Sequence, residues 1–308
     1  MNNSEKGWSD YWEKDGADGE VFVNAQGERH PALAEFWQQQ FAGLPEGSRI
    51  IDLASGAGSV FAHLPEGHDH QLFAADISQV ALKAVEERFP NVMTIECSAD
   101  QVPLDDGVFD VVVSQFGVEY AGIGAFAEVA RLIATEGRFV ALCHVREGYI
   151  DTSNRVQLTE AKLAAKIDFI DKAVNLITAM FASDAQAIRR AEDDFVPAAT
   201  QVGNAIGRSK KGIHAYLFLG FRELFEKRQQ YDLADIVGWL DDMRGELDMN
   251  IDRLTRMCEA AMSVDDINTV KGRFKEAGVE DVLCTHFETL GNDLPVAWHL
   301  AARREKLQ

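Results

Sequence analysis

Two glycines and two aspartates near the start of the chain are spaced to hold a nucleotide-like ligand. The apolar run "IIDLASGAGS" at 50–59 passes Asp52 and then Gly56 and Gly58. Glycines after a strand let a ligand lie against backbone N–H groups at the start of the next helix. Asp76 ends the following apolar run, where a carboxylate can accept both hydroxyls of a ribose. Together these residues predict a nucleoside ligand, whereas the glycines alone also fit a tight turn without one.

Two positions bear on the kind of nucleotide. The dinucleotide fingerprint GxGxxG needs a third glycine, and this chain has Phe61 at that place. Asp52 puts a carboxylate where the ammonium group of a ligand could be held. The pattern therefore favours an ammonium-bearing nucleoside over a pyrophosphate, and an NAD(P)-dependent oxidoreductase is the less favoured enzymatic interpretation.

Three further side chains follow later apolar runs and could act on a second substrate. Glu119 and Tyr120 come after "SQFGV", and His144 lies in "ALCHV". In an open α/β sheet, ligands bind beyond the carboxyl ends of the strands, so these side chains are expected to face the reacting centre. A general base at Glu119 or His144 is one hypothesis. The alternatives are an exposed glutamate and a hydrogen-bonded core histidine.

The elements that must position these residues alternate over 49–145. Short apolar runs such as "RIIDLA" and "FDVVVSQ" are separated by helix-like segments such as "SQVALKAVEERF". This alternation predicts a parallel sheet with helices on both faces, and uninterrupted apolar strands are typical of a sheet that is buried on both sides.

Helical spacing replaces the strands from about 150 to 262. One stripe of apolar residues steps by three or four and is expected to lie on a single helix: Leu163, Ile167, Ile170, Val174, Ile177 and Phe181. A heptad stripe over 233–261 allows a homodimeric coiled coil, but the breaks at "GRSKKG" and Gly220 favour an intramolecular helical subdomain. A segment of this length is a structured insertion rather than a loop.

The sheet pattern resumes after the insertion. Ser263 and Asp266 form a predicted capping box, which begins a helix that stops near Gly278. Two strands follow within 279–304 and are joined through "GND".

These motifs together resemble the class I S-adenosylmethionine-dependent methyltransferases. The resemblance is carried by "IIDLASGAG", "AADISQVAL", "ADQVPLDDGVFDVVVSQFG" and the final "PVAWHLAARR". It implies a Rossmann-like α/β sandwich with a seven-stranded, mostly parallel sheet, into which the helical segment is inserted as an all-helical cap. The expected domains are a segment at 1–48 that closes over the cofactor, a cofactor-binding domain at 49–149 and 263–308, and a substrate lid at 150–262.

The resemblance also implies roles for single residues toward S-adenosyl-L-methionine. The Gly56 backbone would meet the methionine end, Asp76 the ribose, and Ile77 the adenine face. The implied cofactor-binding set is Arg29, Asp52, Ala54, Gly56, Gly58, Asp76, Ile77, Ala99, Asp100 and Gln115. The chain departs from the family pattern twice, with Ala54 at a usual glycine and Ser98 where many members have Asp or Asn, so Asp100 is the candidate for the adenine contact.

Charge and composition bear on the partners. Fifty acidic and thirty basic residues give a formal charge of -20, which disfavours nucleic acid as a partner. No stretch approaches the roughly 18 apolar residues of a membrane span, and the polar start of the chain does not resemble a signal peptide. The four cysteines show no CxxC spacing, which suits the cytoplasm and predicts no metal site.

We therefore expect methyl transfer from S-adenosyl-L-methionine to an O or N atom of a small-molecule acceptor, with S-adenosyl-L-homocysteine as product. The candidate catalytic residues are Glu119, Tyr120 and His144. A methyltransferase acting on a protein side chain and a non-catalytic scaffold that binds the cofactor are the alternatives.

Overall fold

The structure is a computed structural model that describes residues 12, 30–208, 210, 212–289, 291 and 293–306, without the side chain of residue 208. The chain divides into two compact units. The first comprises Met1–Asp151 and Ala260–Gln308, and the second comprises Thr152–Glu259.

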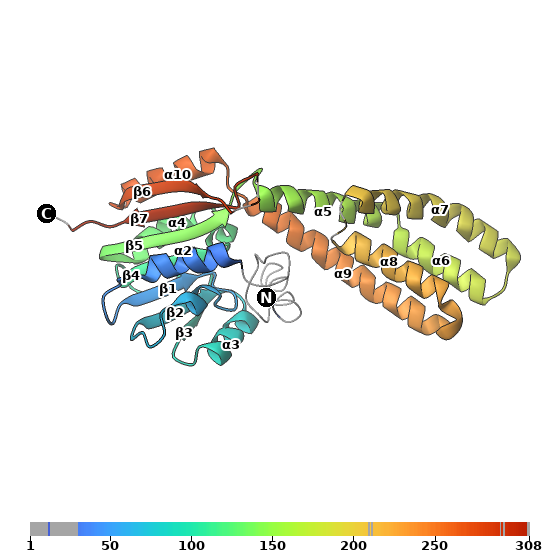
Figure 1. Ribbon diagram of the computed structural model, residues 1–308, viewed down its shortest axis with the longest axis horizontal. Coiled ribbons are helices and arrows are strands. Elements are labelled where there is room, and N and C mark those ends of the chain that lie inside the picture. The colour runs from blue at the N-terminus through green and yellow to red at the C-terminus, as the bar shows by residue number, and fades with distance from the viewer. Residues whose placement is uncertain are drawn as a thin grey trace. The chain divides into compact units, whose positions relative to one another are not determined.

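The described residues of the first unit form one seven-stranded sheet (Figure 1). Its strands are β1 (Arg49–Leu53), β2 (Gln71–Asp76), β3 (Met93–Glu96), β4 (Phe109–Gln115), β5 (Ile133–His144), β6 (Glu280–Phe287) and β7 (Ala297–Arg303). The order is β3-β2-β1-β4-β5-β7-β6, and β7 runs antiparallel to both of its neighbours while the other pairs are parallel. The predicted seven-stranded, mostly parallel sheet is confirmed.

The chain order of the strands reverses between β1 and β4, which are direct neighbours in the sheet. In open α/β sheets the connections leave the carboxyl ends of two such strands toward opposite sides, and ligands bind in the crevice between them. The glycine turn follows β1 and the segment with Glu119 follows β4, so this reversal brings the two predicted halves of the site to one edge.

Helices cover both faces of the sheet. Alternate strand residues point to opposite sides, as the period of two requires. One face packs against α4 (Ala125–Leu132) and α10 (Val264–Glu276) through residues such as Leu53, Val112 and Phe139. The other face packs against α2 (Pro31–Phe41), η1 (Val60–His63) and α3 (Gln79–Arg88); its strand residues are Ile50, Leu72, Ala74, Val111, Val113, Val140 and Leu142.

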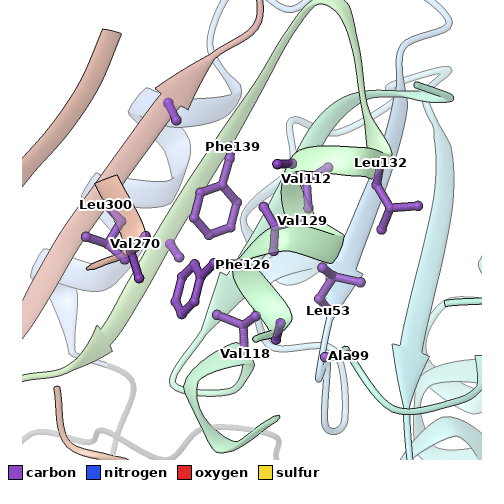
Figure 2. Close-up of a cluster of buried hydrophobic side chains, with 14 of the residues drawn as sticks. Leu53, Ala99, Val112, Val118, Phe126, Val129, Leu132, Phe139, Val270 and Leu300 are labelled. Carbon is purple, nitrogen blue, oxygen red and sulfur yellow. The ribbon is translucent and has the colours of Figure 1, made fainter. Parts of the chain in front are cut away.

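Figure 2 shows the first of these cores, where Phe126 and Val129 of α4 lie beside Val112 and Phe139 of the sheet, and Val270 of α10 lies beside Leu300. Phe126 packs edge-on against Phe139 of β5 and Phe274 of α10, with ring centroids 6.2 Å away in both pairs. All three rings are fully buried. This packing fixes the α4 end of the connection that begins at the carboxyl end of β4.

The helix α10 begins as the sequence predicts. The Ser263 side chain accepts the backbone N–H of Asp266, and the Asp266 side chain accepts the backbone N–H of Ser263. The helix ends at Glu276, and Gly278 takes a positive φ of 68° that suits a residue without Cβ.

The second unit is helical throughout its described residues. Its helices are α5 (Tyr149–Lys166), which starts in the first unit, α6 (Phe169–Phe181), α7 (Ala185–Arg208), α8 (Ile213–Glu226) and α9 (Leu233–Ala260). The expectation of a single helix over 163–181 is wrong. The chain breaks at Asp168, which adopts a left-handed φ of 55°, so the stripe is shared between α5 and α6.

The heptad stripe lies on α9, and its first half is used within the chain. Ile236, Leu240, Met243 and Leu247 are buried in one cluster with residues of α5, α6, α7 and α8. This packing buries the first half of the stripe within the chain. A homodimer stays a prediction. Among the helices that the structure describes, none combines the length and apolarity needed to cross a membrane.

Candidate functional site

Asp76 organises the glycine turn after β1. Its Oδ2 accepts the backbone N–H of Gly56 at 2.9 Å, and its Oδ1 accepts the backbone N–H of Ser78 at 2.8 Å. Burial raises the pKa of this carboxyl, and the backbone N–H groups of Ser78, Gly56 and Ile77 partly offset the effect. Each carboxylate oxygen has a further lone pair, so Asp76 can still accept hydroxyl groups from a ligand.

The turn itself needs residues that tolerate positive φ. Gly56 and Gly58 have φ of 52° and 75°. A Cβ at Gly56 would collide with the indole of Trp12, and one at Gly58 would lie 3.2 Å from Phe89. From the last turn of α3, the Arg88 guanidinium donates to the Ala57 carbonyl. The turn is therefore shaped by close neighbours as well as by its own glycines.

Ala54 stands in the same strained region, with a φ of 52°. This is the position where the family commonly has glycine, and a left-handed conformation costs an L-residue about 1–2 kcal/mol. Ala54→Gly should raise the free energy of unfolding by about 0.5–1 kcal/mol, after the greater freedom of glycine in the unfolded chain is subtracted. Urea denaturation measures the change.

Ala127→Gly is the matched control, because Ala127 is exposed inside α4. There the same substitution should destabilise by about 1 kcal/mol. Equal losses from both variants would show that the φ of Ala54 carries no strain.

Asp52 is the most unusual group in this region. Its side chain is 1% exposed, and neither carboxylate oxygen has a hydrogen-bond partner among the described residues. Burial, and next the charge of Asp76, raise the pKa of Asp52 well above its ordinary value. A buried carboxylate without a partner is costly, and a cation beside it would remove that cost. Asp52 thus fits a positively charged ligand.

The end of β4 is tied to the turn by side-chain hydrogen bonds. Gln115 accepts from Trp37 Nε1 at 2.5 Å and donates to Ser59 Oγ at 3.2 Å. Ser114 Oγ donates to the Leu53 carbonyl at 2.7 Å and accepts the Val118 backbone N–H at 2.9 Å. These bonds hold β1, β4 and the segment after β4 in one arrangement.

Gly117 shows how closely these segments approach each other. A Cβ at Gly117 would lie 2.6 Å from the Ala54 carbonyl oxygen and 2.8 Å from the Ala54 Cβ. Only a residue without a side chain fits there, so the backbone after β4 lies directly on the glycine turn.

The three candidate catalytic residues lie together at the ends of β4 and β5. His144 Nδ1 is 2.8 Å from Glu119 Oε1, and the same oxygen accepts the His144 backbone N–H at 2.8 Å. The His144 ring also lies near the rings of Phe116 and Tyr120, at centroid distances of 4.8 and 5.7 Å. Glu119 and His144 are both buried, so the expectation of an exposed glutamate is wrong.

The residues expected near adenine are less closely gathered. Ile77 is half-buried after β2, the Ala99 side chain belongs to the core shown in Figure 2, and Asp100 is exposed. Arg29 lies outside the described residues, and so does the rest of the segment before His30 except Trp12. His30 itself caps α2, because its side chain accepts the Ala32 backbone N–H.

Several residues that hold the site were not singled out by sequence. A hydroxyl at the end of an apolar strand, as in "VVVSQFG", is the signal that could have pointed to Ser114. Arg88 and Trp37 are reached only through the fold. The described residues contain no group of three or more His, Cys, Asp or Glu side chains arranged to hold a metal ion.

Comparison with known proteins agrees with this arrangement. Residues 51–141 match the methyltransferase domain family. An uncharacterized methyltransferase of Schizosaccharomyces pombe is 25% identical over 157 residues, which span 50% of this chain and 62% of that protein. The ubiquinone/menaquinone biosynthesis C-methyltransferase UbiE of Rickettsia rickettsii is 27% identical over 176 residues, which span 49% of this chain and 71% of that protein.

Among solved structures, the complex between the Haloferax volcanii Trm112 methyltransferase activator and the putative methyltransferase is similar, with a TM-score of 0.39 and 21% identity. The similarity covers 46% of this chain and 62% of that chain.

The strand order, the glycine turn and the domain match define an S-adenosylmethionine-dependent methyltransferase fold. Residues 51–141 form a methyltransferase domain of the class I S-adenosylmethionine-dependent type, and S-adenosylmethionine is the cofactor of this domain. The residues present suit this cofactor, because Asp52 offers a buried carboxylate with no hydrogen-bond partner among the described residues to a cationic ligand, and Asp76 keeps lone pairs for a ribose.

Proposed function

We propose that this protein transfers a methyl group from S-adenosylmethionine to an O or N atom of a small-molecule acceptor. The observation that carries the proposal is the buried Asp52 carboxylate, which has no hydrogen-bond partner among the described residues and lies at the end of the strand that enters the glycine turn. A nucleoside that carries positive charge at its methionine end matches the two acids Asp52 and Asp76, and a pyrophosphate does not.

In this proposal each residue of the chain has a separate task. The Gly56 backbone and Gln115 meet the methionine end, Asp76 binds the ribose, and Ile77 packs on the adenine. Ala99 and Asp100 address the adenine edge. When bound, the cofactor supplies an electrophilic methyl group on a sulfonium. The protein then contributes mainly by placing the acceptor in line with that methyl, which can lower the barrier by about 7–11 kcal/mol.

A small-molecule acceptor is supported by the formal charge of -20, which repels nucleic acid. The role of the helical unit in enclosing the acceptor stays a proposal, and its support is its place in the chain directly after β5. A cytoplasmic location is likewise proposed from the cysteines, none of which forms a disulfide with a described residue.

Carbon is the second candidate for the acceptor atom, because the Rickettsia relative is named a C-methyltransferase. Methylation of a protein side chain and cofactor binding without catalysis stay as further alternatives.

Titration calorimetry with S-adenosylhomocysteine and with NAD tests the cofactor half of the proposal. We expect binding of S-adenosylhomocysteine and none of NAD, and the reverse result would favour an oxidoreductase. A labelled-methyl assay over a metabolite panel then tests transfer. Binding without transfer to any small molecule, together with transfer to protein, would move the acceptor to a protein side chain.

A further inference from the structure

The pair formed by Glu119 and His144 has a defined proton arrangement. Glu119 Oε1 already accepts the His144 backbone N–H, so it acts as an acceptor toward the ring as well. The proton shared with the ring therefore sits on Nδ1, which leaves the lone pair on Nε2. Nε2 is buried and has no hydrogen-bond partner in the part of the chain that the structure describes. Burying a polar nitrogen without a hydrogen bond costs free energy, and an O–H or N–H group of a ligand can donate the hydrogen bond that removes this cost.

The surroundings of the ring hold it in place. The ring of Phe116 lies 4.8 Å from the imidazole, and that of Tyr120 lies edge-on at 5.7 Å. Phe116 has a left-handed φ of 51°, which is rare for a bulky residue. Such backbone outliers cluster at functional sites. The Phe116 backbone N–H is fixed by the Leu142 carbonyl at 2.7 Å. The ring is thus held between an acid and two aromatic side chains.

The pair also lies at the edge where methyl transfer would take place. Glu119 is in η2 (Val118–Ala121), whose first N–H is bound by Ser114 at the end of β4, and His144 is the last residue of β5. Glu119 therefore follows one of the two strands at the reversal, and His144 lies at the carboxyl end of β5, which pairs with that strand.

We propose that His144 Nε2 is a general base, with Glu119 as its positioning residue, and that it ionises the hydroxyl group of a phenolic or enolic acceptor. This inference rests on the proposed function and deepens it by naming the acceptor class.

The chemistry of the possible acceptors favours a phenol or an enol over an amine or an aliphatic alcohol. A phenol ionises near pH 10 and an imidazolium near 6.5 in model compounds, so an imidazole with an anionic partner can take the phenolic proton during attack. A neutral amine is already a nucleophile, and burial by itself disfavours its charged form, so it needs no base. The flanking Phe116 and Tyr120 rings favour a flat, conjugated molecule over an aliphatic alcohol.

The proton and electron balance closes without another reactant. Nε2 takes the hydroxyl proton, and the resulting imidazolium is neutralised by Glu119. The anionic oxygen, or the carbon conjugated with it, forms the new bond to the methyl group. The carbon–sulfur bond breaks and its electron pair stays on sulfur, which gives a neutral thioether. If carbon is the attacking atom, the product is first a ketone, and the proton on that carbon then moves to the ketone oxygen, which restores the phenol or enol.

The test compares acceptors that need a base with acceptors that do not, and each variant is compared with the unmodified chain on the same acceptor. The probes are 4-methoxyphenol, which is neutral at the assay pH, 4-nitrophenol at a pH where it is ionised, an enolised β-dicarbonyl, and the matching anilines. The proteins are the unmodified chain, His144→Gln, Glu119→Gln and, as control, His286→Gln, which changes an exposed histidine on β6. Calorimetry with S-adenosylmethionine accompanies every rate.

We expect His144→Gln to lose about 10²–10⁴-fold in kcat on 4-methoxyphenol and to keep most of its rate on 4-nitrophenol. Cofactor affinity should be unchanged in His144→Gln and Glu119→Gln, and all rates should be unchanged in His286→Gln. Glu119→Gln should also slow transfer to 4-methoxyphenol more than transfer to 4-nitrophenol, because the imidazole loses the carboxylate that orients it. A purely structural pair would lower both phenol rates alike.

Three results would overturn the inference. They are equal losses on both phenols, transfer to the anilines alone, and cofactor binding without transfer to any phenol or enol. A protein that binds no S-adenosylmethionine would instead refute the proposed function itself, and calorimetry separates that result from the other three.

Discussion

Asp76→Ala should weaken the binding of S-adenosylmethionine by about 10²–10⁴-fold. The variant removes the acceptor of two ribose hydroxyl groups, and each hydrogen bond to a charged group is worth about 1.5–3 kcal/mol. It also leaves the N–H groups of Gly56 and Ser78 without the oxygens that accept them at 2.9 and 2.8 Å. Loss of the Gly56–Asp76 hydrogen bond loosens the glycine turn that holds the cofactor. The missing ribose contacts and the loosened turn therefore both lower the affinity.

Titration calorimetry measures this affinity, and circular dichroism checks that the variant is folded. Asp76→Asn is the companion variant, because its single amide oxygen can still accept one N–H and should give an intermediate loss. Asp105→Ala is the control at an exposed loop carboxylate and should bind the cofactor normally. An unchanged affinity in folded Asp76→Ala would remove the ribose role of Asp76.

Binding of S-adenosylmethionine should release a proton from Asp52. Burial and the neighbouring Asp76 raise the pKa of Asp52, so the cofactor-free protein holds this proton to a higher pH than an exposed carboxyl does. A cationic ligand beside the group favours its ionised form. Affinity should therefore increase as pH rises from the ordinary carboxyl range of about 4 toward the raised value. Asp76, whose pKa is also raised, faces the same ligand and adds to this dependence.

Calorimetry in two buffers with different ionisation enthalpies counts the released protons. In Asp52→Asn the release should shrink, and the affinity near neutral pH should fall about tenfold or more with the loss of a charge-assisted contact. If the unmodified protein and Asp52→Asn release equal numbers of protons, Asp52 is not the source.

The ionised Asp52 carboxylate favours cofactor binding but destabilises the cofactor-free protein. A carboxyl whose pKa is raised on folding contributes stability below its unfolded pKa, and this contribution is lost as pH rises through the folded pKa. Asp52→Asn should therefore stabilise the cofactor-free protein at neutral pH and have little such effect below about pH 4. Thermal unfolding at the two pH values tests this sign.

Much of the first unit could be predicted because its signals are local. Uninterrupted apolar runs predicted the strands, and the spacing of Ser263 and Asp266 predicted the start of α10. The break at Asp168 could not be predicted, because its left-handed backbone interrupts a stripe whose apolar spacing continues across it. A helical period describes which faces are apolar, and it does not report a change of axis between two consecutive helices.

The candidate site also contains residues that could be predicted locally and contacts that depend on the fold. The glycine turn and the acids at strand ends could be predicted from neighbouring residues. The contact between Glu119 and His144 joins residues 25 apart in the chain and depends on the pairing of β4 with β5. A sequence also cannot show that the Asp52 carboxylate has no hydrogen-bond partner within the described part of the chain.

The Ser114 hydroxyl has a consequence for the order of events during turnover. It bonds at once to the end of β1, which enters the glycine turn, and to the first N–H of η2, which carries Glu119. A displacement of the turn by an arriving nucleoside is therefore passed through one oxygen atom to the acid that orients the imidazole. We expect the two substrates to enter in a fixed sequence, with the methyl donor first, because its arrival sets the alignment that the second molecule meets.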